Sequence, residues 1–408
     1  MNAPSWLPSA ATRHPERTAV ETPEGALTYA ELLERAEAAP ARSEIDAVAG
    51  PDFAVALHAC LLRGVPVIPL DPRLSVTERE ERRRLAGDIP AARDVATVLF
   101  TSGTTARPRP VHLTYGNWEA NARGSAQAIG LDPEERWLCA LPLAHVGGLS
   151  ILIRSAIYGT TAVLHERFDA AAVARALDKD GITVVSLVPT TLGRVLDVGL
   201  DRPPDLRCAL LGGAPASPAL LERAAAASIP IAQTYGLTEA CSQVTTSPPG
   251  DPATAGPPLP GVEVRIAQDG EILVGGPTVA PCAVADDGFL HTGDLGALDE
   301  RGRLIVTGRK ADTIVSGGEN VAPAEVEAVL LAHPAVLDAG VFGRPDVAWG
   351  EAVAATVVLR PGEAATEGAL REYCSEHLAR FKVPKEIRFA PALPRTPSGK
   401  LLRRALAD

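Results

Sequence analysis

The sequence predicts an α/β protein with a large N-terminal domain of doubly wound sheets, which includes a small β-barrel-like subdomain, and a small α+β C-terminal domain. Apolar, strand-like runs alternate with helical stretches between residues 95 and 234, which is typical of a parallel, doubly wound sheet. The next segment is rich in glycine and proline and has short alternating strands. Mixed helix and strand then return. These changes place the N-terminal domain at 1–308, its β-rich subdomain at 247–307 and the C-terminal domain at 309–408.

Length and composition place the chain among ordinary globular proteins of two or three domains. Its 408 residues are 46% apolar and 22% charged, which is enough to bury a large core. The formal net charge of −11 argues against nucleic-acid binding through bulk electrostatics. Only 5 of the 39 basic residues are lysines, so a lysine inside a motif can mark a place that needs a compact ammonium. For any single lysine, retention by chance is the alternative.

The cysteine pattern and the apolar runs predict a cytoplasmic protein. The six cysteines include no C-x-x-C pair, so a disulfide framework or a zinc site is not indicated. The N-terminus has no basic segment followed by an apolar one, and no apolar run reaches the length of a membrane span. We therefore expect a cytoplasmic chain without membrane insertion. The sequence leaves a homodimer open.

The first 94 residues carry local signals rather than a regular pattern. Residues 27–33 are expected to be the end of a strand that runs into a helix, with Thr28 as the N-cap and Glu31 completing a capping box. A buried helix, an edge strand with two prolines and a charged helix are expected at 53–62, 65–70 and 73–84.

The remaining elements follow from apolar runs and helix caps. A helix is expected to begin near Thr114, Asp169 is expected to cap another, and Pro323 starts a third. The expected strands are 95–100, 137–141, 161–164, 183–188, 208–211, 231–234, 262–266, 271–274 and 354–359. Apart from the helix that begins near Thr114, the expected helices of this part are 149–156, 169–177, 218–227, 323–331 and 366–380.

The segment 101–109 has the composition of a phosphate-binding loop between a strand and a helix. It is rich in glycine and hydroxyl groups, so backbone N–H groups and hydroxyls can surround a phosphate. A Walker loop is excluded because no Gly-Lys-Ser or Gly-Lys-Thr closes the segment. A solvated turn is the alternative.

Two further segments follow apolar strands. Residues 212–215 (Gly-Gly-Ala-Pro) permit close approach of the backbone to a ligand at the edge of a parallel sheet, or form a plain turn. In the segment 235–239, the ring of Tyr235 can cover a base, Thr238 can reach a phosphate and Glu239 can hold Mg²⁺. The alternative for this segment is a strand end followed by a helix cap.

Three more segments lie nearer the C-terminus. Asp294 follows a tight turn and can accept hydrogen bonds from a ribose diol, or form an Asx turn. The glycines within 308–320 suggest a hinge or a narrow ligand channel, with a surface hairpin as the alternative. Lys400 lies on a loop flanked by glycine and proline in a basic tail, for which a solvated basic face is the default interpretation.

Together these motifs have the order and approximate spacing of one family. The sequence resembles the adenylate-forming acyl-CoA synthetases over nearly its whole length. The resemblance implies that the C-terminal domain is mobile and rotates about a hinge between two half-reactions. At 141–159, 164–168 and 238–243 the sequence is most similar to the o-succinylbenzoate–CoA ligases of menaquinone biosynthesis.

The resemblance implies a ligase that uses ATP and Mg²⁺ to adenylate a carboxylic acid, releases pyrophosphate and then forms a thioester with CoA. It implies catalytic roles for Lys400, Thr238, Glu239 and His145, with Glu239 as the metal ligand. Lys400 would bridge the acid and the α-phosphate. ATP and CoA would be bound by Thr101, Ser102, Gly103, Thr104, Thr105, Gly213, Ala214, Pro215, Tyr235, Gly236, Asp294, Arg309, Gly317 and Gly318.

The acyl pocket is expected near His145, Gly147 and Gly148, with Arg154 as a further substrate ligand. Arg154 lies in an apolar stretch, where a charge needs a partner. A diacid offers one, because one carboxylate is activated and the other can pair with the guanidinium. The alternative is that Arg154 reaches solvent or pairs with a local acid.

Departures from the family pattern leave other functions open. Ala106, Arg109 and Ala311 replace the glycine, the lysine and the aspartate or lysine that are usual there, and the region before the loop is short. The alternatives are a ligase for another aryl or fatty acid, an adenylation module that loads a carrier protein, or a non-catalytic nucleotide-binding relative. The presence of Lys400, Glu239 and Asp294 argues against the last.

Overall fold

The computed structural model describes residues 5–87, 94–102, 108–347, 349–395 and 401–406. A large sheet contains β1 (Thr18–Thr22), β2 (Gly25–Thr28), β7 (Arg136–Cys139), β8 (Thr161–Leu164), β9 (Val184–Leu187), β10 (Cys208–Leu211), β11 (Ile231–Leu237) and β12 (Ser242–Thr246). Their order is β12-β11-β10-β9-β7-β8-β1-β2. The strands from β11 to β1 run parallel, and the two edge strands are antiparallel.

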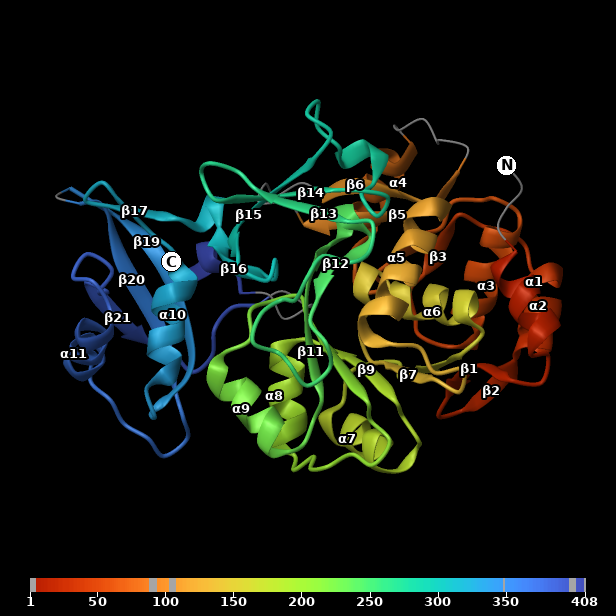
Figure 1. Cartoon of the computed structure of the whole chain (residues 1–408), viewed down its shortest axis with the longest axis horizontal. Helices are drawn as coiled ribbons and strands as arrows, with labels where there is room; N and C mark the ends of the chain where they lie inside the picture. The colour runs from red at the N-terminus through yellow and green to blue at the C-terminus, as the bar shows by residue number, and fades with distance from the viewer. Residues whose placement is uncertain (1–4, 88–93, 103–107, 348, 396–400, 407–408) are drawn as a thin grey trace.

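Helices cover both faces of this sheet (Figure 1). One face packs against α1 (Trp6–Arg13), α2 (Tyr29–Ala38), α3 (Pro51–Leu62), α5 (Tyr115–Ile129) and α6 (Val146–Tyr158), and the other against α7 (Ala170–Lys179), α8 (Pro189–Asp197) and α9 (Pro218–Ala226). Neighbouring strand residues alternate between the faces, as Trp137 and Leu138 do. Burial on both faces explains the continuous apolar runs and confirms the predicted doubly wound sheet.

The candidate phosphate loop connects two antiparallel strands, β5 (Val95–Ser102) and β6 (Pro108–Thr114). The expected order of strand, loop and helix is therefore wrong in one respect, since a second strand precedes the helix. The prolines at 108 and 110 hid this strand, and an unpaired edge of a two-stranded sheet tolerates them. The helix itself begins as predicted, because Thr114 forms a capping box with Asn117.

Two parallel strands, β3 (Glu44–Asp46) and β4 (Ile68–Leu70), form a small sheet before this hairpin, and the charged helix α4 (Val76–Gly87) follows them.

The helix caps predicted in this half of the chain are present. Thr28 and Glu31 form a reciprocal capping box, and the carboxylate of Asp169 accepts a hydrogen bond from the backbone of Ala172. These signals lie within one turn of helix, which makes them readable from sequence.

The β-rich segment is a four-stranded antiparallel sheet made of β13 (Glu263–Ile266), β14 (Glu271–Gly275), β15 (Leu290–Leu298) and β16 (Leu304–Arg309). Its apolar core includes Ile272, Val274 and Leu304 and continues into Tyr235 and Val244 of the β11–β12 hairpin. This packing holds the hairpin, which follows the parallel strands, against the second sheet.

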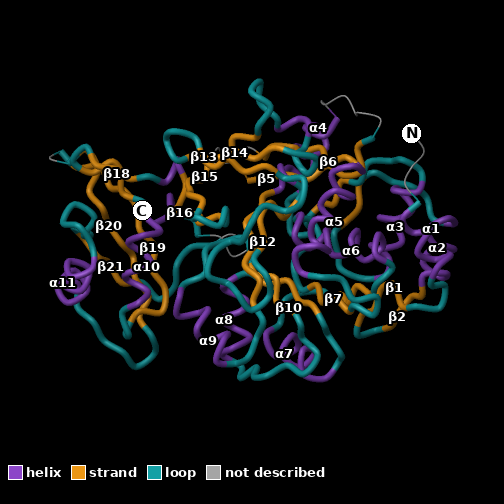
Figure 2. The backbone as a smooth tube through the Cα atoms, viewed as in Figure 1, coloured by secondary structure: helices purple, strands orange, loops and turns teal. Residues whose placement is uncertain are grey.

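The C-terminal part contains a separate sheet of β17 (Ile314–Ser316), β18 (Glu319–Val321), β19 (Val336–Asp346), β20 (Gly350–Leu359) and β21 (Glu386–Phe389), with α10 (Pro323–Ala332) and α11 (Glu367–His377) packed on it. A short 3-10 turn, Lys310–Asp312, connects it to β16. Figure 2 shows this sheet at the opposite end of the molecule from α1 and α2. Among the described residues, no helix is long and apolar enough to cross a membrane.

Candidate active site

Tyr235 and Gly236 lie at the end of β11, where this strand pairs with β12, and Thr238 and Glu239 directly follow it. A Cβ atom on Gly236 would lie 1.7 Å from the backbone oxygen of Ser242, so only glycine allows the two strands to approach this closely. Thr238 and Glu239 form a 3-10 turn, Thr238–Ala240, at the tip. The hairpin therefore presents these two side chains together at one end of the sheet.

The hydroxyl of Tyr235 donates a hydrogen bond of 2.9 Å to Oδ2 of Asp294. Nε of Arg309 lies 2.8 Å from Oδ1 of the same carboxylate, and Asp294 is 6% exposed. Burial, followed by the negative charge of Asp294, raises the pKa of the Tyr235 hydroxyl, which therefore stays protonated and donates. Three residues predicted to bind nucleotide are thus in direct contact, although they come from β11, β15 and β16.

Gly213, Ala214 and Pro215 form the turn after β10, which is the strand beside β11. Gly213 has a φ of 81°, which favours glycine. All three residues are exposed. They lie at the carboxyl end of the parallel strands, where ligands of such sheets bind.

The base of the candidate phosphate loop lies beside the 3-10 turn of the β11–β12 hairpin. Both β5 and β6 contact this turn, and Thr101 pairs with Arg109 across the base. Thr101 is half-buried, and Ser102 is the last residue of β5. Gly103, Thr104 and Thr105 lie outside the described residues, as does Ala106.

His145 precedes α6 as its N-cap residue. Gly148 is fixed by packing, because a Cβ atom there would lie 2.5 Å from the backbone oxygen of Pro142, whereas the nearest atom to a Cβ on Gly147 is 3.5 Å away. Desolvation lowers the pKa of His145, and the negative charge of Asp71 opposes this shift. His145 is therefore a neutral imidazole at physiological pH.

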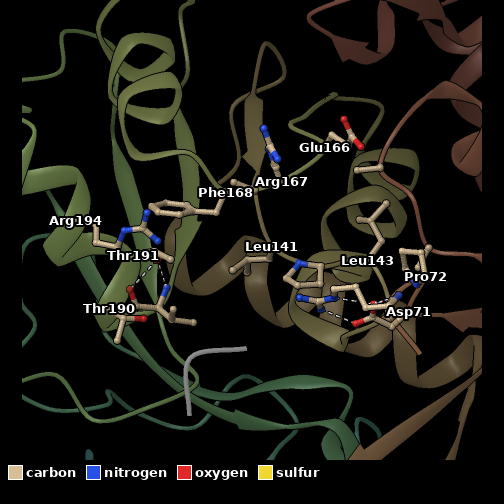
Figure 3. Close-up of a pocket in the computed structure, with 17 residues that line it drawn as sticks. Asp71, Pro72, Leu141, Leu143, Glu166, Arg167, Phe168, Thr190, Thr191 and Arg194 are labelled. Carbon is tan, nitrogen blue, oxygen red and sulfur yellow. Dashed lines mark hydrogen bonds and ion pairs between the residues drawn. The ribbon is translucent and has the colours of Figure 1, made fainter. Parts of the chain in front are cut away.

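A cavity of about 430 Å³ opens beside the segment that leads to His145. Its walls include residues 140–144, the loop after β8, the start of α8 and the loop after β4. Figure 3 shows Arg194 and Phe168 on one side of the cavity and Asp71 and Leu143 on the other. The cavity therefore lies at the carboxyl ends of β7, β8 and β9, adjoining the predicted acyl site.

Sequence reasoning missed the charged groups of this cavity. Asp71 pairs with Arg73 at 2.5 Å, and hydrogen bonds from Arg73 lower the pKa of the Asp71 carboxyl. Arg194 lies over the ring of Phe168, 5.0 Å from its centroid, and Arg167 also lines the wall. Their position after parallel strands was the available signal, but the Asp-Pro-Arg turn at 71–73 matched no chemical motif.

Arg154 is 1% exposed and lies on the middle of α6. Nη2 donates to Oδ1 of Asn121, and the guanidinium carbon lies 5.5 Å from the ring centroid of Trp137. Neither alternative considered from the sequence is observed among the described residues, since Arg154 neither reaches solvent nor pairs with an acid. It does not line the 430 Å³ cavity.

Gly317 and Gly318 form the two-residue turn between β17 and β18. Their φ angles are 63° and 85°, as a type I′ hairpin requires. Trp349 packs over this turn, since a Cβ on Gly317 would lie 2.8 Å from its ring. The surface hairpin considered from the sequence is therefore the local structure. Lys400 lies outside the described residues.

Comparison with known proteins matches two parts of the chain. The family model described as AMP-binding enzyme matches residues 77–282, and the model of its C-terminal domain matches 325–400. The chain is 38% identical to the 2-succinylbenzoate–CoA ligase of Bacillus licheniformis, over the full length of both chains. The chain belongs to the AMP-binding enzyme family.

Solved structures of AMP-binding enzymes agree with this assignment. The o-succinylbenzoate–CoA synthetase of Bacillus subtilis bound to ATP and magnesium has a TM-score of 0.90, at 35% identity, covering 99% of each chain. Its complex with the acyl-adenylate intermediate has a TM-score of 0.88, at 35% identity, covering 99% of this chain and 98% of that one. The fold is therefore shown for the whole molecule.

The TM-scores also depend on how the N-terminal and C-terminal parts are arranged in each solved structure. A double mutant of the Bacillus subtilis enzyme bound to a product analogue has a TM-score of only 0.71, at 36% identity and with 99% of this chain covered. The present structure is thus more similar to the ATP-bound and acyl-adenylate-bound forms.

The alignment with the Bacillus licheniformis ligase spans 479 positions, so at least 71 of them (479 less 408) have no counterpart in this shorter AMP-binding enzyme.

The residues of this AMP-binding enzyme fit a magnesium nucleotide. The carboxylate of Glu239 is half-buried and has no ion pair or hydrogen bond among the described residues, so it is free to take a cation. No group of three His, Cys, Asp or Glu residues in the described part of the chain could hold a metal alone. That pattern suits Mg²⁺, which is usually held by one or two carboxylates, phosphates and water.

Proposed function

We propose that this enzyme ligates 2-succinylbenzoate to CoA at the expense of ATP. The single observation that carries the proposal is the 38% identity to a 2-succinylbenzoate–CoA ligase over the full length of both chains. The contact of Tyr235, Asp294 and Arg309, three residues expected to bind nucleotide, supports it. The product would serve menaquinone biosynthesis.

The first half-reaction joins the acid to AMP. A carboxylate oxygen attacks the α-phosphorus of ATP, the bond from this phosphorus to pyrophosphate breaks, and an acyl-adenylate forms. Little covalent chemistry is required of the protein, so positioning and charge neutralisation carry the step. Glu239 would hold Mg²⁺, which neutralises phosphate charge, and Asp294 would accept hydrogen bonds from the ribose.

Lys400 would contact both the carboxylate and the α-phosphate in the first half-reaction. Thr101 to Thr105 would hold the outer phosphates, and Thr238 would contribute its hydroxyl. Gly213 to Pro215 and the ring of Tyr235 would flank the adenine. These assignments rest on the family resemblance, and the contact of β5 and β6 with the 3-10 turn after β11 supports them.

The second half-reaction forms the thioester. The CoA thiolate attacks the acyl carbon, the bond from this carbon to the adenylate oxygen breaks, and AMP leaves. Because the present arrangement is closer to the adenylate-bound relatives, the C-terminal domain would rotate before this step. The turn with Gly317 and Gly318 would then line the path of the pantetheine chain.

The acid would lie beside His145, Gly147 and Gly148. One of its carboxylates would be activated, and the other would pair with Arg154. A fully buried guanidinium with no acid partner among the described residues supports this role, since a dicarboxylate would supply the missing charge. This requirement favours 2-succinylbenzoate over a benzoate or a fatty acid.

The proposed location is the cytoplasm, and a homodimer is the assembly that the sequence leaves open. All six cysteines are free thiols, and five of them are buried, which suits a reducing compartment. Fractionation of cells that produce the protein tests the location, and light scattering of the purified protein tests the assembly.

The deciding experiment measures ATP- and CoA-dependent thioester formation with 2-succinylbenzoate, benzoate and a fatty acid. We expect product with 2-succinylbenzoate, at a kcat/KM at least tenfold above the other acids. AMP and pyrophosphate should appear in equal amounts with the thioester. A preference for benzoate or the fatty acid would overturn the proposed substrate, and ATP hydrolysis without thioester would overturn the ligase activity.

A further inference from the structure

We infer that Asn121 is a positioning residue that holds the guanidinium of Arg154 and keeps its charge available for the second carboxylate of the acid. This inference rests on the proposed function and extends it to a residue of another helix, α5. Both side chains are fully buried, with exposed fractions of 1% for Arg154 and 0% for Asn121.

The orientation of the Asn121 amide is fixed by the backbone of β12. Its Nδ2 donates a hydrogen bond of 3.0 Å to the carbonyl oxygen of Gln243, and its Oδ1 accepts one of 2.5 Å from Nη2 of Arg154. Because a carbonyl only accepts, the amide nitrogen has to face Gln243 and the oxygen has to face the guanidinium. Asn121 therefore binds Arg154 through a neutral acceptor.

Trp137 supports the guanidinium from a second direction. The guanidinium carbon lies 5.5 Å from the ring centroid, within the range of a cation–π contact. The indole nitrogen donates a hydrogen bond of 3.0 Å to the hydroxyl of Ser186, which holds the ring in place. Two neutral groups thus set the position of Arg154 and leave its charge uncompensated.

The other titratable neighbours also leave the charge uncompensated. Tyr158 and Cys241 are the groups whose electrostatic influence reaches Arg154, and burial raises the pKa of both, so both are neutral at physiological pH. Nε of Arg154 has no hydrogen-bond partner among the described residues. A buried cation in this state is costly, and an incoming carboxylate removes the cost.

Strand β12 packs against α6 and thereby relates this cation to the site. It follows the 3-10 turn that contains Glu239, in the hairpin of the candidate active site. Arg154 is carried by the helix that begins after His145. The hairpin and α6 therefore carry Glu239 and His145 near one end of the helix and the guanidinium of Arg154, which lacks a counter-charge, further along it. This arrangement suits an acid with two separated carboxylates.

An aspartate at position 121 would supply the missing counter-charge from within the protein. For Asn121→Asp we expect the KM for 2-succinylbenzoate to rise at least tenfold, with the KM for ATP changed less than twofold. The comparison acids are 4-oxo-4-phenylbutanoate and 2-butyrylbenzoate, each of which lacks one of the two carboxylates. The preference for 2-succinylbenzoate over the analogue that still reacts should fall at least tenfold.

Asn117→Asp is a matched control one helical turn earlier on α5. The amide of Asn117 donates to the carbonyl oxygens of Pro277 and Val279, so the substitution removes the same type of hydrogen bond at a place where no arginine of the described residues contacts the amide. Its preference between the acids should equal that of the unmodified enzyme. A ratio of kcat/KM values is independent of the folded fraction, so partial unfolding of either variant does not disturb the comparison.

Asn121→Asp in an Arg154→Met background completes the test. There the aspartate should change the preference less than twofold, because the guanidinium that it neutralises is absent. An unchanged preference in the single variant, or an equal change in the Asn117 control or the Arg154→Met background, would overturn the inference. Failure of the unmodified enzyme to form the thioester would overturn the proposed function, and the inference with it.

Discussion

Tyr235 and Asp294 are joined by a hydrogen bond of 2.9 Å, although 59 residues separate them in the chain. Arg309 binds the other carboxylate oxygen, so Asp294 is held from two sides and is 6% exposed. This contact connects the hairpin that follows the large sheet to the second sheet. It thereby places the ring and the carboxylate beside the junction with the C-terminal part.

Asp294→Asn should weaken ATP binding specifically. The substitution keeps an acceptor for Tyr235 but removes the charge that pairs with Arg309 and would bind the ribose hydroxyls. We expect the KM for ATP to rise about tenfold, equivalent to about 1.4 kcal/mol, with the KM for the acid nearly unchanged. Initial rates at varied ATP and acid check this. Asp299→Asn, which removes the ion pair of Asp299 with Arg303, is the matched control.

Gly148 and Gly147 should respond very differently to alanine. Gly148→Ala forces a Cβ atom to within 2.5 Å of the oxygen of Pro142, so the segment before His145 has to move. We expect at least about 2 kcal/mol of lost stability and a marked loss of activity. Gly147→Ala meets no close atom and should stabilise α6 by up to about 1 kcal/mol. Urea unfolding measures the free energy of unfolding of both variants. Equal changes in the two variants would contradict the packing argument.

Arg154→Met should separate recognition of the acid from recognition of ATP. The substitution removes a charge-assisted hydrogen bond to the second carboxylate, which contributes about 1.5–3 kcal/mol. The KM for 2-succinylbenzoate should rise by one to two orders of magnitude, and the KM for ATP should stay within twofold. Equal rises in both values would show that Arg154 supports the fold rather than the substrate.

Lys400→Ala should abolish one half-reaction and spare the other. Pyrophosphate exchange should fall by at least two orders of magnitude, because the residue would contact the acid and the α-phosphate only during adenylation. Thioester formation from added acyl-adenylate and CoA should remain near the level of the unmodified enzyme. Lys179→Ala, on α7, serves as the control. Equal loss of both half-reactions would contradict a role of Lys400 in adenylation alone.

Local signals made much of the fold predictable from the sequence. The capping box of Thr28 and Glu31 and the cap at Asp169 each involve residues within one turn, so no distant contact can hide them. The buried parallel strands also read correctly, since apolar side chains are required on both faces. Strand β19 was missed because glycines and a proline interrupt it, and its pairing with β20 is what stabilises it.

The site was predictable only in part, because contacts between segments that are distant in the sequence bring its residues together. The motif residues Tyr235 and Asp294 were grouped through family resemblance, since nothing local in either segment indicates their contact. Asn121 lies 33 residues from Arg154, and its amide carries no signal until α5 and α6 are packed together. The pair Asp71 and Arg73 reaches the neighbourhood of His145 only through the folding of the first sheets.

Acid should destabilise the protein through His58. This imidazole is 2% exposed, and burial lowers its pKa from the ordinary value of 6.5 to about 4. The folded state therefore binds this proton less readily than the unfolded state. The resulting contribution is fully present above pH 6.5 and is lost as the pH falls towards 4. Between pH 7 and pH 5 the loss should be of the order of 2 kcal/mol.

His58→Leu isolates this contribution, because leucine fills a similar apolar volume and does not titrate. The comparison uses the change in unfolding free energy between pH 7 and pH 5, measured with urea, so that a difference in stability at pH 7 does not affect it. That change should be smaller in the variant by about 2 kcal/mol. Other histidines with lowered pKa values, among them His112 and His165, titrate in both proteins and cancel in the difference. An identical change in both proteins would show that His58 is not protonated on unfolding in this range.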